Sequence, residues 1–169
     1  ILLTGVAHDS GIYARFLEAV KDEGAQILFA DPALDIDMGD GLRLDVVWPP
    51  PGLAGTLPKA SNETSIVLRA FAGSSSLLLT GDIEGGAEAG ILASDADIDV
   101  DILKVAHHGS RTSSMTGFLL AASPRLAIIS VGRHNKFGHP HPWVTKRFQT
   151  LGIPYRTTAD EGTITIELK

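Results

Sequence analysis

Cysteine is absent from the 169-residue sequence. Its absence excludes disulfides and thiolate metal ligands, so a bound metal would be held by His, Asp or Glu. Long hydrophobic runs are also missing: the longest, such as 119–122 and 126–129, fall far short of the ~20 apolar residues that span a membrane. No methionine begins the chain, which opens inside the apolar run Ile1–Leu3. We therefore expect a fragment whose upstream part lies outside this sequence.

Acidic residues are absent from the long segment 102–159, although the whole chain has a net charge of -6. The same segment carries eight Lys and Arg residues and five of the six His. Such a one-sided charge indicates an anionic ligand, for example phosphate or nucleic acid. A solvated basic face with chance clustering is the alternative interpretation.

The length and the hydrophobic pattern predict one domain, residues 1–169, of the layered α/β or α+β class. Strands alternate with helices along the second half of the chain. We expect helices over 10–24, 84–93, 113–122 and 142–151. We expect strands over 27–29, 42–47, 65–71, 76–80, 100–106, 126–131, 155–157 and 163–168.

Three of the apolar strands end in residues that bind metals or anions. The first leads to Asp82, the second to His107 and His108, and the third toward His139 and His141. Ligands in layered α/β proteins gather where the carboxyl ends of buried strands meet loops. The sequence therefore predicts a site at one edge of the sheet.

Two interpretations remain open for several of these residues. Asp82 can cap the helix that follows it, or it can bridge two cations with its two oxygens. His107 and His108 should point to opposite sides of a strand end, so one faces the metal and the other positions a neighbour or substrate. The segment His139–Pro142 has a His-x-His spacing that suits two ligands, but it also suits a rigid loop that opens a helix.

Candidate phosphate-binding residues lie around these strand ends. Ser110 and Thr112 place hydroxyls near the expected start of a helix, where free amides favour an anion. The full set of candidates for substrate or phosphate binding is Asn62, Ser110, Thr112, Lys136, His139 and His141.

The motifs in 78–82, 102–110, 129–132 and 138–142, together with an Asn-x-x-Ser-x-Val-Leu strand beginning at Asn62, form one ordered series. In order and spacing they resemble the soluble domain of ComEC-type DNA-internalisation competence proteins. The resemblance runs from about Asn62 to the C-terminus and more loosely back to Ile1.

This resemblance implies a metallo-β-lactamase-like αββα sandwich with two divalent metal ions, zinc or manganese. It implies that Asp82 is the bridging ligand and His108 the late His ligand, with His107 as a further catalytic residue. The family's His-x-(His or Asp)-x-Asp-His loop has no counterpart here. We therefore expect the chain to be the C-terminal portion of the domain, with the loop upstream or lost, and to bind metal weakly by itself.

The function that follows is a metal-dependent phosphodiesterase or nuclease acting on single-stranded or duplex DNA during competence. We expect a soluble domain on the extracytoplasmic face of a bacterial inner membrane, with the membrane channel of its parent protein as partner and no organic cofactor. Two alternatives remain: another phosphoester hydrolase of the same fold, or a non-catalytic module that binds DNA or docks on the channel with a degenerate metal site.

Overall fold

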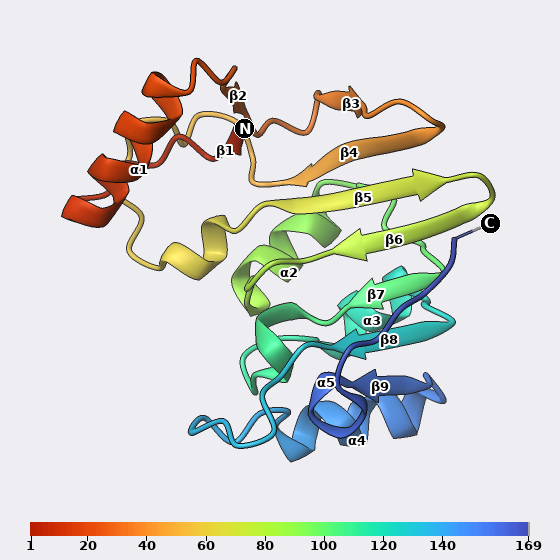
Figure 1. The fold of residues 1–169 in the computed structure, drawn as a ribbon. Helices are drawn as coiled ribbons and strands as arrows, with labels where there is room; N and C mark the ends of the chain where they lie inside the picture. Colours follow the sequence, from red (N-terminus) through yellow and green to blue (C-terminus); the bar gives the residue numbers. More distant parts are fainter. Residues whose placement is uncertain (169) are drawn as a thin grey trace.

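The computed structural model describes residues 1–168, and a mixed sheet of seven strands forms its centre (Figure 1). Strands β3 to β6 pair antiparallel, whereas β6 to β9 pair parallel. In spatial order, which is also chain order, the strands are β3 (Asp35–Asp37), β4 (Leu42–Trp48), β5 (Val67–Ala72), β6 (Ser75–Leu79), β7 (Ile102–Lys104), β8 (Leu126–Ile129) and β9 (Tyr155–Thr157).

Helices cover one face of this sheet. They are α2 (Gly85–Ala93), α3 (Thr116–Ala122) and α4 (Pro142–Leu151), and each connects two neighbouring parallel strands (Figure 1). Their apolar side chains pack on the inward residues of the strands, because a sheet face and a helix stripe must each be buried against another element. The core between the layers includes Leu78, Leu103, Phe118, Ile129 and Phe148, each at most 1% exposed.

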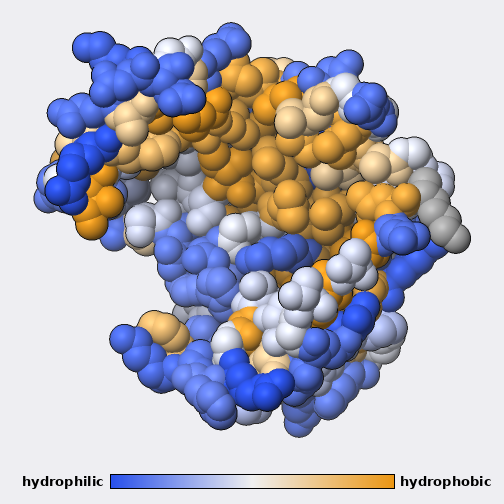
Figure 2. Space-filling model, viewed as in Figure 1, coloured by the Kyte–Doolittle hydropathy of each residue, from blue (hydrophilic) through white to orange (hydrophobic). Residues whose placement is uncertain are grey.

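The opposite face of the sheet is apolar too, yet it is only partly buried. Leu78 is fully buried, whereas its neighbours Leu77 and Leu79 point to the other side and are half-buried. Across the sheet, Leu79 pairs with Leu68 and Leu77 with Ala70. Figure 2 shows the resulting hydrophobic surface over β4, β5 and β6. Apolar patches of this kind are found where a protein contacts a partner, a membrane or a ligand.

The first part of the chain lies beside the sheet at one end of β4 (Figure 1). Strands β1 (Leu2–Leu3) and β2 (Leu28–Phe29) form a small parallel pair, and helix α1 (Gly11–Asp22) connects them. Ser10 caps α1, since its side chain accepts a hydrogen bond from the amide of Tyr13. No helix among residues 1–168 is both long and apolar enough to cross a membrane.

The mixed α/β class and the four expected helices are confirmed; α4 has the expected bounds, and the other three helices have shifted ends. α3 begins at Thr116 rather than at residue 113, because the segment before it forms a turn. The strand β3 was not expected: its three residues, Asp35–Asp37, carry two exposed acids and lie on the sheet edge.

The strand expected over 163–168 is wrong. Its alternation of polar and apolar residues suits a strand, but the short helix α5 (Thr158–Glu161) follows β9 directly, where only a turn was expected. The chain then leaves the free edge of β9 and runs across the sheet toward the β5–β6 turn (Figure 1). The segment therefore has no strand edge to pair with.

Because Leu77 and Leu78 lie on opposite faces of β6, we expect them to contribute very differently to the free energy of unfolding. Leu78→Ala should lower the free energy of unfolding of the 169-residue chain by about 2–5 kcal/mol, because it leaves a cavity in the core. Leu77→Ala should cost no more than about 1 kcal/mol, since its half-exposed side chain leaves no cavity. Urea denaturation of both variants measures the difference. Equal losses would contradict the assignment of faces.

Candidate functional site

The carboxyl ends of β6, β7 and β8 meet at one edge of the sheet, because these strands are parallel. Backbone hydrogen bonds tie the loops that follow them. The amide of His107 donates to the carbonyl of Gly81 at 3.2 Å, and the amide of His141 donates to that of Gly109 at 2.8 Å. The structure therefore brings the Asp82 loop, the His107–His108 turn and the His139–His141 loop together. Figure 2 shows the molecule hollowed at this edge.

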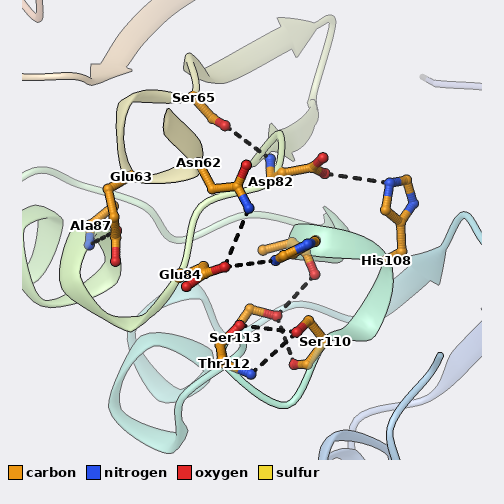
Figure 3. A network of polar contacts seen from close by, with 12 residues as sticks. Asn62, Glu63, Ser65, Asp82, Glu84, Ala87, His108, Ser110, Thr112 and Ser113 are labelled. Atoms are coloured by element: carbon orange, nitrogen blue, oxygen red, sulfur yellow. Dashed lines mark hydrogen bonds and ion pairs between the residues drawn. The ribbon is translucent and has the colours of Figure 1, made fainter. Parts of the chain in front are cut away.

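Asp82 and His108 face each other across this edge (Figure 3). Asp82 Oδ1 lies 3.5 Å from His108 Nε2, and both side chains are more than two-fifths exposed, so a ligand can reach them. The other ring nitrogen, Nδ1, lies 2.7 Å from the carbonyl oxygen of Ser130. A carbonyl only accepts, so Nδ1 is the donor in this contact, and Nε2 is the ring nitrogen that faces Asp82.

This pair fits two ligands of one cation. With metal–ligand bonds of about 2.0–2.1 Å, two ligands of a tetrahedral zinc lie about 3.3 Å apart, close to the observed 3.5 Å between Asp82 and His108. The Ser130 carbonyl supplies the outer hydrogen bond that orients a metal-binding imidazole. Among residues 1–168, however, no group of three or more His, Asp or Glu side chains could hold a metal ion. The two donors alone would supply half of the ligands of a four-coordinate zinc.

The alternative role of Asp82 as a helix cap is wrong. The first amides of α2, those of Gly86 and Ala87, donate to the carboxylate of Glu63. Glu63 lies in the 3-10 turn η1 (Ser61–Thr64). Because Glu63 caps the helix, the Asp82 carboxylate is left to face His108.

His107 and His108 lie in the 3-10 turn η2 (Ala106–Gly109) rather than on a strand, since β7 ends at Lys104. Both have left-handed backbones, with φ of 46° and 55°. This conformation is uncommon outside glycine and is found at functional sites. The turn, and not strand alternation, sends the two rings to different partners.

His107 turns toward Glu84 and His139. Its Nδ1 lies 3.1 Å from Glu84 Oε1, off the line of a good hydrogen bond. Asn62 donates its side-chain amide to the same Glu84 oxygen at 3.3 Å (Figure 3). Asn62 therefore positions Glu84, and Glu84 in turn lies against His107.

Two glycines permit the close approach of these loops. Gly81 has φ +52°, and a Cβ there would lie 2.9 Å from the Cβ of Ser65. Ser65 Oγ in turn accepts a hydrogen bond from the Asp82 amide at 3.3 Å. Gly109 has φ +78°, and a Cβ there would lie 2.8 Å from Pro140. A larger residue at either position would push the loops apart.

Ser110 and Thr112 lie in the turn before α3, where their hydroxyls are 2.9 Å apart (Figure 3). Two backbone amides between Thr112 and the start of α3 already have an acceptor. The amides of Ser114 and Met115 donate to the carboxylate of Glu88. An anion at Ser110 and Thr112 would therefore meet their hydroxyls, not the amides of Ser114 and Met115.

Glu88 is 1% exposed, and it fixes this turn from inside α2. Burial raises the pKa of its carboxyl, while hydrogen bonds from the amides of Met115 and Ser114 and the charge of Arg147 act in the opposite direction. Arg147, on α4, donates to the carbonyls of Ser113 and Ser114 at 3.0 and 3.1 Å. We call the Glu88 and Arg147 side chains, with the turn that they hold, the Glu88 clamp.

The two imidazoles of the His-x-His segment have different surroundings. The His139 ring lies 5.9 Å from that of His107. Burial lowers the pKa of His139, and the charges of His107, His108 and His141 lower it further. His141 instead caps α4: its Nδ1 accepts the amide of Trp143 at 3.2 Å.

Sequence reasoning missed Glu84 and Lys104. Lys104 Nζ donates to the Gly81 carbonyl at 3.3 Å. Burial lowers the pKa of Lys104, and the nearby Asp82 charge opposes this shift. A lysine inside the apolar run 102–106 was the available signal for Lys104. Glu84 had none, because its role depends on two distant segments.

No family model matches the chain. The chain is similar to ComE operon protein 3 of Bacillus subtilis, at 33% identity over 156 residues, which are 92% of this chain and 19% of that protein. Recombination protein 2 of Haemophilus influenzae is 34% identical over 126 residues, 75% of this chain and 15% of that protein. Competence protein ComA of Neisseria gonorrhoeae is 36% identical over 104 residues, 61% of this chain and 15% of that protein. The chain thus spans about a fifth or less of the length of these relatives.

The Glu88 clamp predicts a pH-dependent stability. The folded pKa of Glu88 lies above its ordinary 4.5, so its stabilising contribution is present below that pH and is lost as pH rises through the raised value. Relative to Glu88→Gln, the wild-type chain should therefore lose free energy of unfolding as pH rises above 4.5. Urea denaturation at a series of pH values measures this. Parallel pH profiles for the two proteins would contradict it.

Proposed function

We propose that the chain is a region of a ComEC-type competence protein and forms part of a divalent-metal phosphodiesterase that cleaves DNA during its uptake. The observation that carries the proposal is the Asp82–His108 pair, whose atoms lie 3.5 Å apart at the carboxyl ends of parallel strands. The hydrogen bond from His108 Nδ1 to the Ser130 carbonyl supports a metal-binding role for Nε2.

The intact domain is proposed to be a metallo-β-lactamase-like αββα sandwich. Its support is the apolar face formed by Leu68, Leu77 and Leu79, which lies opposite the helices and is only half-buried. A second sheet would bury this face as the first layer of helices buries the other. We propose that a segment outside these 169 residues supplies this sheet and the remaining metal ligands.

The residues of the site have separate tasks in this proposal. Bound divalent cations would supply a metal-activated water and neutralise the charge of the phosphodiester. Asp82 and His108 would hold the cations, Asp82 as the bridge. His107, backed by Glu84 at 3.1 Å, would position the substrate or a proton beside them. The hydroxyls of Ser110 and Thr112 would bind phosphate oxygens.

Nucleic acid is the proposed substrate because the chain has no acidic residue between 102 and 159. Phosphate contacts dominate affinity for DNA, so a segment with eight Lys and Arg residues and no carboxylate favours binding. One relative is named as a competence protein, one after the ComE operon and one for recombination, which supports a role in DNA uptake. The proposed location is the extracytoplasmic face of the inner membrane, beside the channel of the same parent protein.

Variants of the two proposed ligands test the assignment. In the parent domain, Asp82→Ala and His108→Ala should each lower nuclease activity at least about 100-fold with manganese, magnesium or zinc, because each removes a direct ligand. Calorimetry should show weaker metal binding for both. Asp99→Ala and His134→Ala, which change exposed residues of the same types away from this pair, should keep full activity.

Two outcomes would overturn the proposal. Activity that survives both ligand variants would contradict the site. DNA binding without cleavage under every metal would support the alternative, a non-catalytic DNA-binding or docking module with a degenerate metal site.

A further inference from the structure

Two large aromatic side chains stand exposed next to the site. Phe137 is 70% exposed and Trp143 57%, although exposure of such side chains is unfavourable in water. Each has a cation over its ring: Lys136 Nζ lies 5.4 Å from the Phe137 centroid, and Arg111 Cζ 5.6 Å from that of Trp143. Exposed aromatic faces beside cations are the elements of single-stranded nucleic-acid binding.

Phe137 is joined to the site by a row of rings. It stacks on His139, with centroids 5.9 Å apart and planes at 20°. His139 lies 5.9 Å from His107, which lies 6.5 Å from His108. A pocket of about 200 Å³ lies along this row, lined by His108, Val131, Gly132, Asn135, Phe137 and His139. The pocket is therefore lined both by His108, a proposed metal ligand, and by the exposed ring of Phe137.

Asn135 holds the loop that carries Phe137. Its side-chain amide donates to the carbonyls of Gly132 and His139 at 2.9 and 2.7 Å. Its Oδ1 accepts from the amides of Phe137 and His139 at 3.2 and 2.9 Å. The loop is thus ordered by its own residues. Because the Asn135 amide already bonds to the loop backbone, it has little capacity left to form hydrogen bonds with a ligand.

We propose that this pocket binds an unpaired nucleobase, stacked on Phe137, while the adjoining phosphate lies at the cations that Asp82 and His108 would hold. The proposal rests on the proposed function and names the form of its substrate: a single strand. Within a duplex, each base is covered by its neighbours and cannot stack on a side chain. Stacking depends on the ring face and not on the base edge, so the pocket should discriminate little between bases.

Equilibrium binding without cleavage tests the proposal. The parent domain is titrated, in EDTA, into a short labelled oligothymidine and into a duplex of equal length, and fluorescence anisotropy is recorded. Phe137→Ala should weaken single-strand binding about 5- to 100-fold and leave duplex binding within about 2-fold. Phe137→Trp should retain single-strand binding, whereas Phe137→Leu should behave like the alanine variant.

Phe29→Leu, at a 57% exposed phenylalanine on β2, is the matched control and should leave both affinities unchanged. Thermal melts check that the Phe137 variants fold. Unchanged single-strand binding by Phe137→Ala, or equal loss for single strand and duplex, would overturn the base pocket.

Cleavage of DNA by the wild type separates the two proposals. Metal-dependent cleavage with normal single-strand binding by Phe137→Ala would overturn the pocket alone. Phe137-dependent single-strand binding by a protein that cleaves nothing would support the pocket and overturn the nuclease.

Discussion

The candidate site depends on one buried carboxylate. Glu88, almost completely buried in α2, accepts the amides of Ser114 and Met115 and so fixes the turn before α3. That turn is bonded to the start of α2 through Gly85 and Thr112, and it follows directly on the His107–His108 turn. Burying a carboxylate is costly unless it is well hydrogen-bonded. Here the hydrogen bonds join the helix layer to the loop that carries the chemistry.

Parallel strands and backbone bonds between loops complete this arrangement. The register of β6, β7 and β8 brings three strand ends together, and glycines at 81 and 109 let their loops touch. Asp82 reaches His108 because Glu63 takes over the capping of α2. Glu63 and Glu88 thus hold backbone amides, whereas Asp82 and His108 face the solvent-accessible edge.

Local patterns predicted more of the fold than of the site. The four expected helices are present, and three strand ends carrying Asp and His indicated one edge. The strand predicted over 163–168 is wrong because alternating polar and apolar residues show only a preference for a strand. Forming the strand also requires the free edge of a neighbouring strand. Glu88 could not be found at all, since its hydrogen-bonding partner lies 26 residues away and an acid inside a helix gives no local signal.

The loop ordered by Asn135 has a consequence for the thermodynamics of recognition. A flexible loop would lose conformational freedom on binding and reduce the affinity accordingly. Here four hydrogen bonds from a single side chain have already restricted the backbone around Phe137 and His139. That entropy loss is part of folding and not of association. Single strands of different sequence therefore bind the same preformed loop surface. Differences in their affinity come from the strands themselves.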